Sequence, residues 1–204
     1  MDPPAGINSV DEYNASSAYE AELNWNAAIE PGLPTYGDAP AHLHAEVATP
    51  WAEGVVVRFS NPEGATSIVN VHRGHGYRTA LWRWEATSSF ILVAGGDAFW
   101  VRPDSPKDWR FLTHLATSCV FSDDGAQAFI ATYTDVVAID RDGVRQWTRR
   151  LAIDGVEVAR ILDGVLVGRA CMDPPDDWRE FRVLTADGSD AEPRVAADRA
   201  APGR

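Results

Sequence analysis

Val136–Arg150 reads VVAIDRDGVRQWTRR, and this stretch decides the fold because it is the clearest β-hairpin in the sequence. Its first arm, Val136–Asp140, alternates its side chains with the period of two that a strand requires. Asp142-Gly143 supplies the turn, since both residue types tolerate the positive φ angles of tight hairpin turns. The returning arm, Val144–Arg149, alternates again, so the stretch predicts two antiparallel strands.

Strand-like segments separated by turn residues continue on both sides of this hairpin. Asp123-Asp124-Gly125 and Asp163-Gly164 are turn signals of the same kind. Ser88–Ala94, SSFILVA, is apolar almost throughout, which predicts a strand buried on both faces. The other predicted strands are 54–60, 66–73, 77–85, 98–102, 109–115, 118–122, 126–133, 156–162, 165–171 and 178–185.

Similar strand ends recur at Val71, Val101, Ile139 and Val183, and each is followed by polar turn residues. Their separations along the chain are 30, 38 and 44 residues. Irregular repeats of about 40 residues, with four strands each, are typical of propeller blades in sequence. The pattern predicts an all-β chain built from β-hairpin repeats.

One segment carries a resemblance to a known fold. Ser118–Leu151 resembles a single blade of a β-propeller, with FSDDG at 121–125 similar to the first turn of many blades. Val137–Trp147, VAIDRDGVRQW, is similar to the outer hairpin of quinoprotein-type blades. The resemblance implies a propeller-like fold of about four small blades, arranged as a closed ring, an open curved stack or a β-sandwich. It implies no cofactor, because propellers that hold a quinone need more blades than this chain supplies.

The chain divides into three parts by composition. Residues 1–50 form an acidic, partly helical arm, in which Ser9-Val-Asp-Glu12 reads as a capping box that opens a short helix over about 10–28. Residues 51–188 form the β-hairpin-repeat domain. Residues 189–204 are rich in Ala, Asp, Arg and Pro and predict a disordered tail.

Composition narrows the class of protein. A hydrophobic content of 45% with eight tryptophans is enough for a sizeable core. The sequence contains no run of eighteen apolar residues, and its first residues, MDPPAGINSV, lack the basic and apolar regions of a signal peptide. Cys119 and Cys171 are too few for a disulfide scaffold. These observations predict a cytoplasmic protein that does not associate with a membrane.

Charge is distributed unevenly along the chain. Residues 1–57 contain nine acids and neither Lys nor Arg, whereas the remaining residues carry 21 acids and all 18 bases. An acidic segment repels nucleic acids and anionic membranes and suits a basic protein surface. Arginines alternate with tryptophans around Trp82 and Trp147, as in single-strand binders. With a pI of about 4.7 and Lys107 as the single lysine, these arginines more simply pair with neighbouring acids.

Candidate catalytic groups are sparse. His42, His44, His72 and His75 could ligate zinc together with Glu46, although none of the helix-borne zinc spacings is present. The Asp-rich turns lack the twelve-residue calcium loop, and the sequence contains no Gly-x-Ser-x-Gly elbow and no phosphate-binding glycine loop. Cys119 lies in an apolar strand, where a thiol is usually inert, and His114 is its nearest histidine in sequence.

The sequence therefore predicts a non-enzymatic protein-binding protein without cofactor or metal. The closest functional analogy is a bacterial immunity protein that neutralises a basic toxin by occluding its active site. Carboxylates would steer the partner, and aromatic side chains would anchor it. The predicted contact residues are Asp11, Glu12, Tyr19, Glu20, Glu22, Trp25 and Glu30. The alternative is a metal-dependent hydrolase or a carbohydrate-binding β-domain that uses the histidines.

Overall fold

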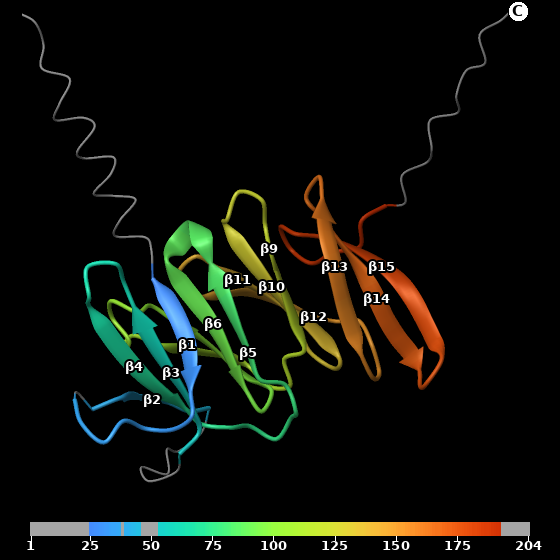
Figure 1. The fold of residues 1–204 in the computed structure, drawn as a ribbon. Coiled ribbons are helices and arrows are strands. Elements are labelled where there is room, and N and C mark those ends of the chain that lie inside the picture. The colour runs from blue at the N-terminus through green and yellow to red at the C-terminus, as the bar shows by residue number, and fades with distance from the viewer. Residues whose placement is uncertain (1–24, 38, 46–52, 193–204) are drawn as a thin grey trace, which may run out of the picture.

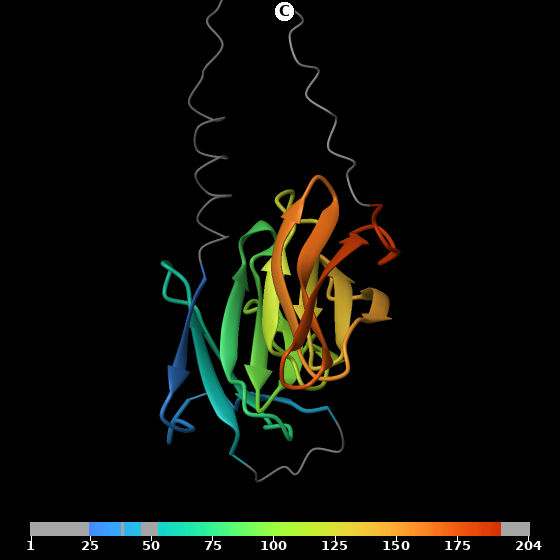
Figure 2. The same ribbon diagram turned by 90° about the vertical axis from the view of Figure 1, so that its right-hand side faces the viewer.

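The computed structural model describes residues 25–37, 39–45 and 53–192, which form fifteen strands, one short 3-10 helix and their connections. The strands make four sheets that stand side by side, in chain order, from one end of the molecule to the other (Figure 1). Figure 2 views this stack from the end formed by the last sheet. The predicted all-β class is confirmed, and no described helix is long and apolar enough to cross a membrane.

The four sheets are almost entirely antiparallel. Sheet I has the order β1 (Asn26–Glu30), β3 (Val55–Ser60), β4 (Thr66–Val71) and β2 (Ala41–Leu43), and only the β2–β4 pair is parallel. Sheet II consists of β5 (Ala80–Trp84), β6 (Ser89–Ala94), β7 (Asp97–Val101) and β8 (Arg110–Thr113), with the 3-10 helix η1 (Glu85–Thr87) between β5 and β6. Sheet III consists of β9 (Ser118–Phe121), β10 (Gln127–Ala131), β11 (Asp135–Asp140) and β12 (Arg145–Arg150). Sheet IV consists of β13 (Val156–Leu162), β14 (Val165–Asp173) and β15 (Asp177–Leu184).

Three apolar clusters hold the stack together, one at each junction between neighbouring sheets. Val57 and Phe59 of sheet I meet Phe90 and Phe99 of sheet II in the first cluster. The second cluster joins sheets II and III, and the third joins sheets III and IV. Each sheet therefore buries apolar surface against the next sheet in the chain, which is the main stabilising contribution to such a fold.

Sheets II and III are covered on both faces, and their inner strands, β6, β7, β10 and β11, are correspondingly apolar. Every residue of β6 is buried, because its alternate side chains enter the first and the second cluster. Phe90 and Leu92 face sheet I, whereas Ile91 and Val93 face sheet III. The prediction that SSFILVA is buried on both faces is confirmed.

The hairpin at 136–150 forms as predicted, as β11 and β12. Gly143 has a φ of 71°, and the Asp140 carboxylate accepts hydrogen bonds from the backbone N–H groups of Asp142 and Val144 at 3.0 and 2.9 Å. The pairing register shifts between Ala138 and Ile139, so the hairpin contains a β-bulge.

The repeated strand ends fall one in each sheet. Val71, Val101, Ile139 and Val183 lie in β4, β7, β11 and β15, and each of these is the third strand of its sheet. All four side chains are buried. The irregular spacing seen in the sequence therefore corresponds to one sheet per repeat.

The structure describes parts of both predicted terminal segments, the N-terminal arm and the C-terminal tail. The predicted helix over about 10–28 is wrong where the structure describes it, because Asn26–Glu30 is a strand that pairs with β3; the rest of that stretch lies outside the described residues. β1 and β2 also share sheet I with β3 and β4, so this sheet uses residues on both sides of the predicted boundary at 50. In the predicted tail, Asp190 bridges to Val183, and 193–204 lie outside the described residues.

The outward faces of the two end sheets carry ion pairs. In sheet I, Arg58 alternates with the inward Val57 and Phe59, and its Nε lies 2.7 Å from Oε1 of Glu30. In sheet IV, Arg169 pairs with Glu157 at 2.6 Å across β13 and β14. These faces differ in chemistry from the three apolar junctions inside the stack.

Candidate functional site

The structure describes two of the seven predicted contact residues. Asp11, Glu12, Tyr19, Glu20 and Glu22 lie outside the described residues. Trp25 is 8% exposed and packs in the cluster between sheets I and II. Glu30 accepts a hydrogen bond from Arg58 at 2.7 Å.

The described surface carries another candidate, which we call the connection face. It is the end of the stack where the chain passes from one sheet to the next, at 72–79, 114–117 and 151–155, together with the turns at 95–96, 132–134 and 174–176. In Figure 1 it is the lower edge of the ribbon. Backbone hydrogen bonds join these segments into one surface.

The bonds run from sheet to sheet. The N–H of Gly76 donates to the carbonyl of Gly95 at 2.7 Å, and the N–H of Ala116 donates to Gly96 at 2.7 Å. The N–H of Gly155 donates to Tyr133 at 2.6 Å, and the N–H of Ile153 donates to Cys171 at 2.9 Å. Side chains on these segments are therefore presented by a braced backbone.

Large apolar side chains stand exposed along this face. Tyr77 is 95% exposed, Ile153 57%, Leu115 37% and Tyr133 36%. They lie in connections or turns, and the sheet cores described above use none of them. Exposed apolar and tyrosine side chains on one face are a common feature of protein contact surfaces, which makes this end of the stack a candidate site.

Leu115 adopts a backbone conformation that L-residues avoid. Its φ is 54°, in the left-handed region, which costs a non-glycine residue about 1–2 kcal/mol. Gly96 approaches it closely: a Cβ on Gly96 would lie 3.2 Å from the Leu115 Cα. Strain of this kind persists where surrounding contacts fix it, and it is concentrated at functional sites.

A side-chain hydrogen bond braces the same connection. Nδ1 of His114 lies 2.9 Å from Oδ1 of Asp97, whose residue is 8% exposed. Gly74 lies directly against this carboxylate, because a Cβ there would meet Asp97 Oδ1 at 2.3 Å. His114, which sequence proximity placed with Cys119, is therefore bound to Asp97, and burial raises the pKa of the Cys119 thiol.

Acidic side chains surround the part of the face formed by sheets III and IV. Asp154, Asp173 and Asp176 are exposed. Burial raises the pKa of the Cys171 thiol, a hydrogen bond with the Asp173 backbone lowers it, and the carboxylates of Asp154, Asp177 and Asp173 raise it again. The connection face thus combines exposed apolar groups with negative charge.

Three of the four candidate histidine ligands, His42 in β2 with His44 and His72 just after β2 and β4, lie together at the edge of sheet I, and Glu46 lies outside the described residues. The ring centroid of His72 is 5.8 Å from that of His42 and 6.1 Å from that of His44. His44 also stacks edge-on against Trp109 at 5.1 Å, and His42 Nδ1 lies 3.3 Å from Nδ2 of Asn70. Among the described residues, no group of three or more His, Cys, Asp or Glu side chains is arranged to hold a metal ion.

The histidine cluster predicts a loss of stability in mild acid. Partial burial lowers the pKa of His72, and the nearby His42 and His44 lower it further. The unfolded chain therefore takes up a proton at His72 near pH 6.5, before the folded protein does, so stability is full above this pH and falls below it. Urea unfolding at pH 7.5 and 5.5 should show the fall for wild type and a smaller one for His72→Gln. An equal fall in both proteins contradicts this assignment.

Comparisons with known proteins do not identify a family for this chain. No protein-family model matches it, and no curated protein sequence matches it. Among solved structures, the crystal structure of AztD from Citrobacter koseri is similar over 69% of this chain, with a TM-score of 0.48 and 14% sequence identity. The match covers 41% of that protein, so this chain spans about two fifths of its length.

Sequence reasoning did not single out Tyr77, Leu115, Tyr133 or Ile153. Tyr77, Leu115 and Tyr133 stood at the ends of the predicted strands 77–85, 109–115 and 126–133, whereas the observed strands β5, β8 and β10 exclude them and leave all four residues in connections or turns. Such residues are uncommon in turns, where polar and small residues dominate. What the sequence lacks is the topology that brings all four to one end of the molecule.

Proposed function

We propose that this protein is a non-enzymatic binding protein that holds a basic protein partner on its connection face. The observation that supports this best is the combination of exposed apolar side chains and exposed acids on a braced backbone. Tyr133 and Ile153 would anchor the partner, and Asp154, Asp173 and Asp176 would pair with its basic residues. Tyrosine anchors within a polar rim are the usual anatomy of such contacts.

The acidic beginning of the chain belongs to the same proposal. Its nine acids without a base would raise the rate of encounter with a positively charged partner. Asp11, Glu12, Tyr19, Glu20 and Glu22 remain proposed contact residues in this segment. The buried position of Trp25 and the ion pair of Glu30 give these two residues a structural role as well.

The fold suits this role as a scaffold. We interpret the four sheets as propeller-type blades in an open stack, since sheets II, III and IV each have the meander of three or four antiparallel strands that a blade has, and sheet I keeps the central β3–β4 hairpin. In such an arrangement the connections between blades gather at one end and are free to vary without disturbing the core. A binding surface placed there would be held rigidly by the three apolar junctions.

The biological form of the proposal is an immunity protein. A basic toxin or effector domain would be steered to the acidic end of the stack and held by its apolar residues. Its active site would then be covered by the connection face, so that inhibition requires no reaction. The protein would act in the cytoplasm of the bacterium that makes the toxin.

The proposal predicts that two side chains carry much of the affinity. Tyr133→Ala combined with Ile153→Ala should weaken binding by about 30-fold or more, since each anchor of this kind typically contributes 1–2 kcal/mol or more. Leu162→Ala is the matched control, because Leu162 is also exposed (44%) but belongs to β13, close to the turn at 163–164.

The measurement has two stages. An extract of the source organism is passed over immobilised wild type, the double variant and the control, and retained proteins are then purified and titrated calorimetrically. We expect a basic protein that binds wild type and the control, is lost with the double variant, and weakens steeply between 50 and 500 mM salt. A partner that is acidic, or that binds all three proteins equally, contradicts the proposal.

A further inference from the structure

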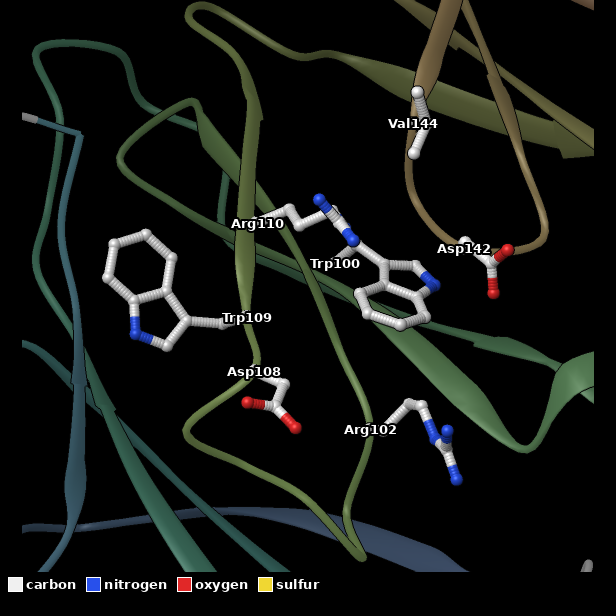
Figure 3. A pocket seen from close by; sticks show the side chains of 7 residues that line it. All are labelled: Trp100, Arg102, Asp108, Trp109, Arg110, Asp142 and Val144. Carbon is white, nitrogen blue, oxygen red and sulfur yellow. The ribbon is translucent and has the colours of Figure 1, made fainter.

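A pocket lies away from the connection face, between sheets II and III. It is a pocket of about 490 Å³ between the outer part of sheet II and the turn that joins β11 to β12. Figure 3 shows Trp100 at its centre, with charged side chains from β8, the β7–β8 loop and the β11–β12 turn around it. A volume between about 300 and 1,000 Å³ is the range of small-molecule sites.

The indole of Trp100 carries an unsatisfied hydrogen-bond donor. Trp100 is 4% exposed, and Gly143 lies against its ring: a Cβ on Gly143 would be 2.7 Å from Trp100 Cγ. Its buried Nε1–H has no hydrogen-bond partner. In Figure 3 this nitrogen lies on the side of Asp142.

In two other tryptophans of this fold, the indole N–H donates a hydrogen bond to a backbone carbonyl. Gly125 lies near the Trp84 ring, and Gly188 lies against the Trp147 ring. Trp84 donates its indole N–H to the carbonyl of Gly125 at 3.2 Å, and Trp147 donates to Thr185 at 3.0 Å. Trp100 has the same glycine contact without the acceptor. An indole can only donate, and a buried donor without an acceptor is unfavourable.

Charged groups of both signs line the pocket. Asp108 and Asp142 are exposed on opposite sides, and Arg110 is exposed beside Trp100. None of these three side chains has an ion-pair or hydrogen-bond partner within the described part of the chain. Arg102, by contrast, pairs with Asp104 at 2.5 Å.

We propose that this pocket binds one hexose-sized ring of a neutral saccharide. A sugar hydroxyl both accepts and donates hydrogen bonds, so it can accept from Trp100 Nε1–H and Arg110 and donate to Asp108 and Asp142. The C–H face of the ring can pack on Val144, which lines the pocket and is 42% exposed. A simple anion meets the two carboxylates, and a simple cation meets Arg102 and Arg110, so neither fits as well.

The ligand reaches the indole through the β11–β12 turn. Gly143 of this turn packs against the Trp100 ring, and the flanking Asp142 and Val144 are exposed, so access to the buried N–H requires the turn to move. This site is independent of the proposed function, because its residues lie outside the connection face. Loss of one can therefore be measured while the other is intact.

Nuclear magnetic resonance of the indole N–H groups tests the inference directly. The chain has eight tryptophans, and Trp100→Phe identifies the Trp100 signal by its disappearance. The probes are the methyl glycosides of glucose, galactose, mannose and N-acetylglucosamine, together with maltose and cellobiose, and glycine and alanine as zwitterions. We expect at least one sugar to shift the Trp100 signal in a saturable way while the Trp84 and Trp147 signals stay in place.

Two exposed variants keep the test valid if Trp100→Phe does not fold. Asp142→Asn and Arg110→Gln should each weaken the sugar about tenfold, as expected for a hydrogen bond to a charged group. Tyr77→Ala, on the connection face, should leave the affinity unchanged. Saturable binding that both pocket variants weaken supports the site. If no sugar shifts the signal, if a zwitterion does so better, or if the variants bind as wild type does, the inference is wrong.

Discussion

Phe129→Ala is expected to lower the free energy of unfolding by about 3–5 kcal/mol, the range for truncating a buried aromatic side chain. Phe129 lies in β10 of sheet III and is fully buried. Its ring centroid is 5.7 Å from that of Trp147, and its neighbours across the junction include Leu166 and Phe181 of sheet IV. Removing it leaves a cavity where two sheets meet.

The size of this effect follows from the way the sheets are joined. Sheet IV packs on one face only, so the third apolar cluster supplies most of the contacts between this sheet and the stack. A cavity there weakens the attachment of sheet IV as well as the core of sheet III. Guanidinium unfolding followed by tryptophan fluorescence measures the change.

A matched aromatic truncation controls for the loss of an aromatic ring as such. Tyr77→Ala removes a ring that is 95% exposed, and it should change stability by less than about 0.5 kcal/mol. If Phe129→Ala were as stable as Tyr77→Ala, sheets III and IV would not be packed as described.

Gly125→Ala is expected to lower the free energy of unfolding by about 2–4 kcal/mol, from backbone strain and overpacking together. Gly125 has a φ of 62° in the turn between β9 and β10. A Cβ there would lie 2.1 Å from Cβ of Ala86 in η1, which belongs to sheet II. The Gly125 carbonyl also accepts hydrogen bonds from Trp84 and Arg141 at 3.2 and 3.1 Å, so the turn cannot move away freely.

Two further variants separate the cost of backbone strain from the cost of the steric overlap with Ala86. Gly64 has a φ of 88° and no atom within 4 Å of the place where a Cβ would lie, so Gly64→Ala should show the backbone cost alone, about 1–2 kcal/mol. Ala86→Gly removes the Cβ that the substituted Gly125 would meet, and it should restore part of the loss in the double variant. If the two changes were simply additive, the contact between the turn and η1 would be absent.

Much of the fold could be predicted because its signals are local. The hairpin at 136–150 carries its own turn, with Asp140 and Gly143 fixing the backbone. The apolar segment SSFILVA indicated a strand covered on both faces, and β6 lies between two sheets for that reason. One recurring strand end per sheet reflects an equivalent position in four similar units.

Sheet I was harder to predict because its pairings are not local. β1 reaches β3 across more than twenty residues, and β2 pairs in parallel with β4 from a Pro-rich stretch. Asn26–Glu30 has a partner in Val56–Ser60 that makes it a strand, whereas its own sequence favours no element strongly. Tertiary pairing thus overrides local preference at this edge.

The candidate surfaces were least predictable for the same reason. Tyr77 and Tyr133 are more than fifty residues apart and are brought to one end only by the up-and-down course of the strands. The unpaired indole of Trp100 depends on which carbonyl a neighbouring sheet offers, as the contrast with Trp84 and Trp147 shows. The sequence singled out the histidines, of which His42, His44 and His72 do meet, but it singled out neither the apolar residues of the connection face nor those of the pocket.

The ion pairs on the outward faces of sheets I and IV make end-to-end association of two molecules unfavourable. Adding another molecule end to end would strip water from Glu30 and Arg58 on one side and from Glu157 and Arg169 on the other, and exposed ion pairs return little for that loss. The interior junctions carry no such penalty, because apolar residues fill them. We therefore expect the charged end faces to disfavour end-to-end association into fibres, as polar caps do in repeat proteins.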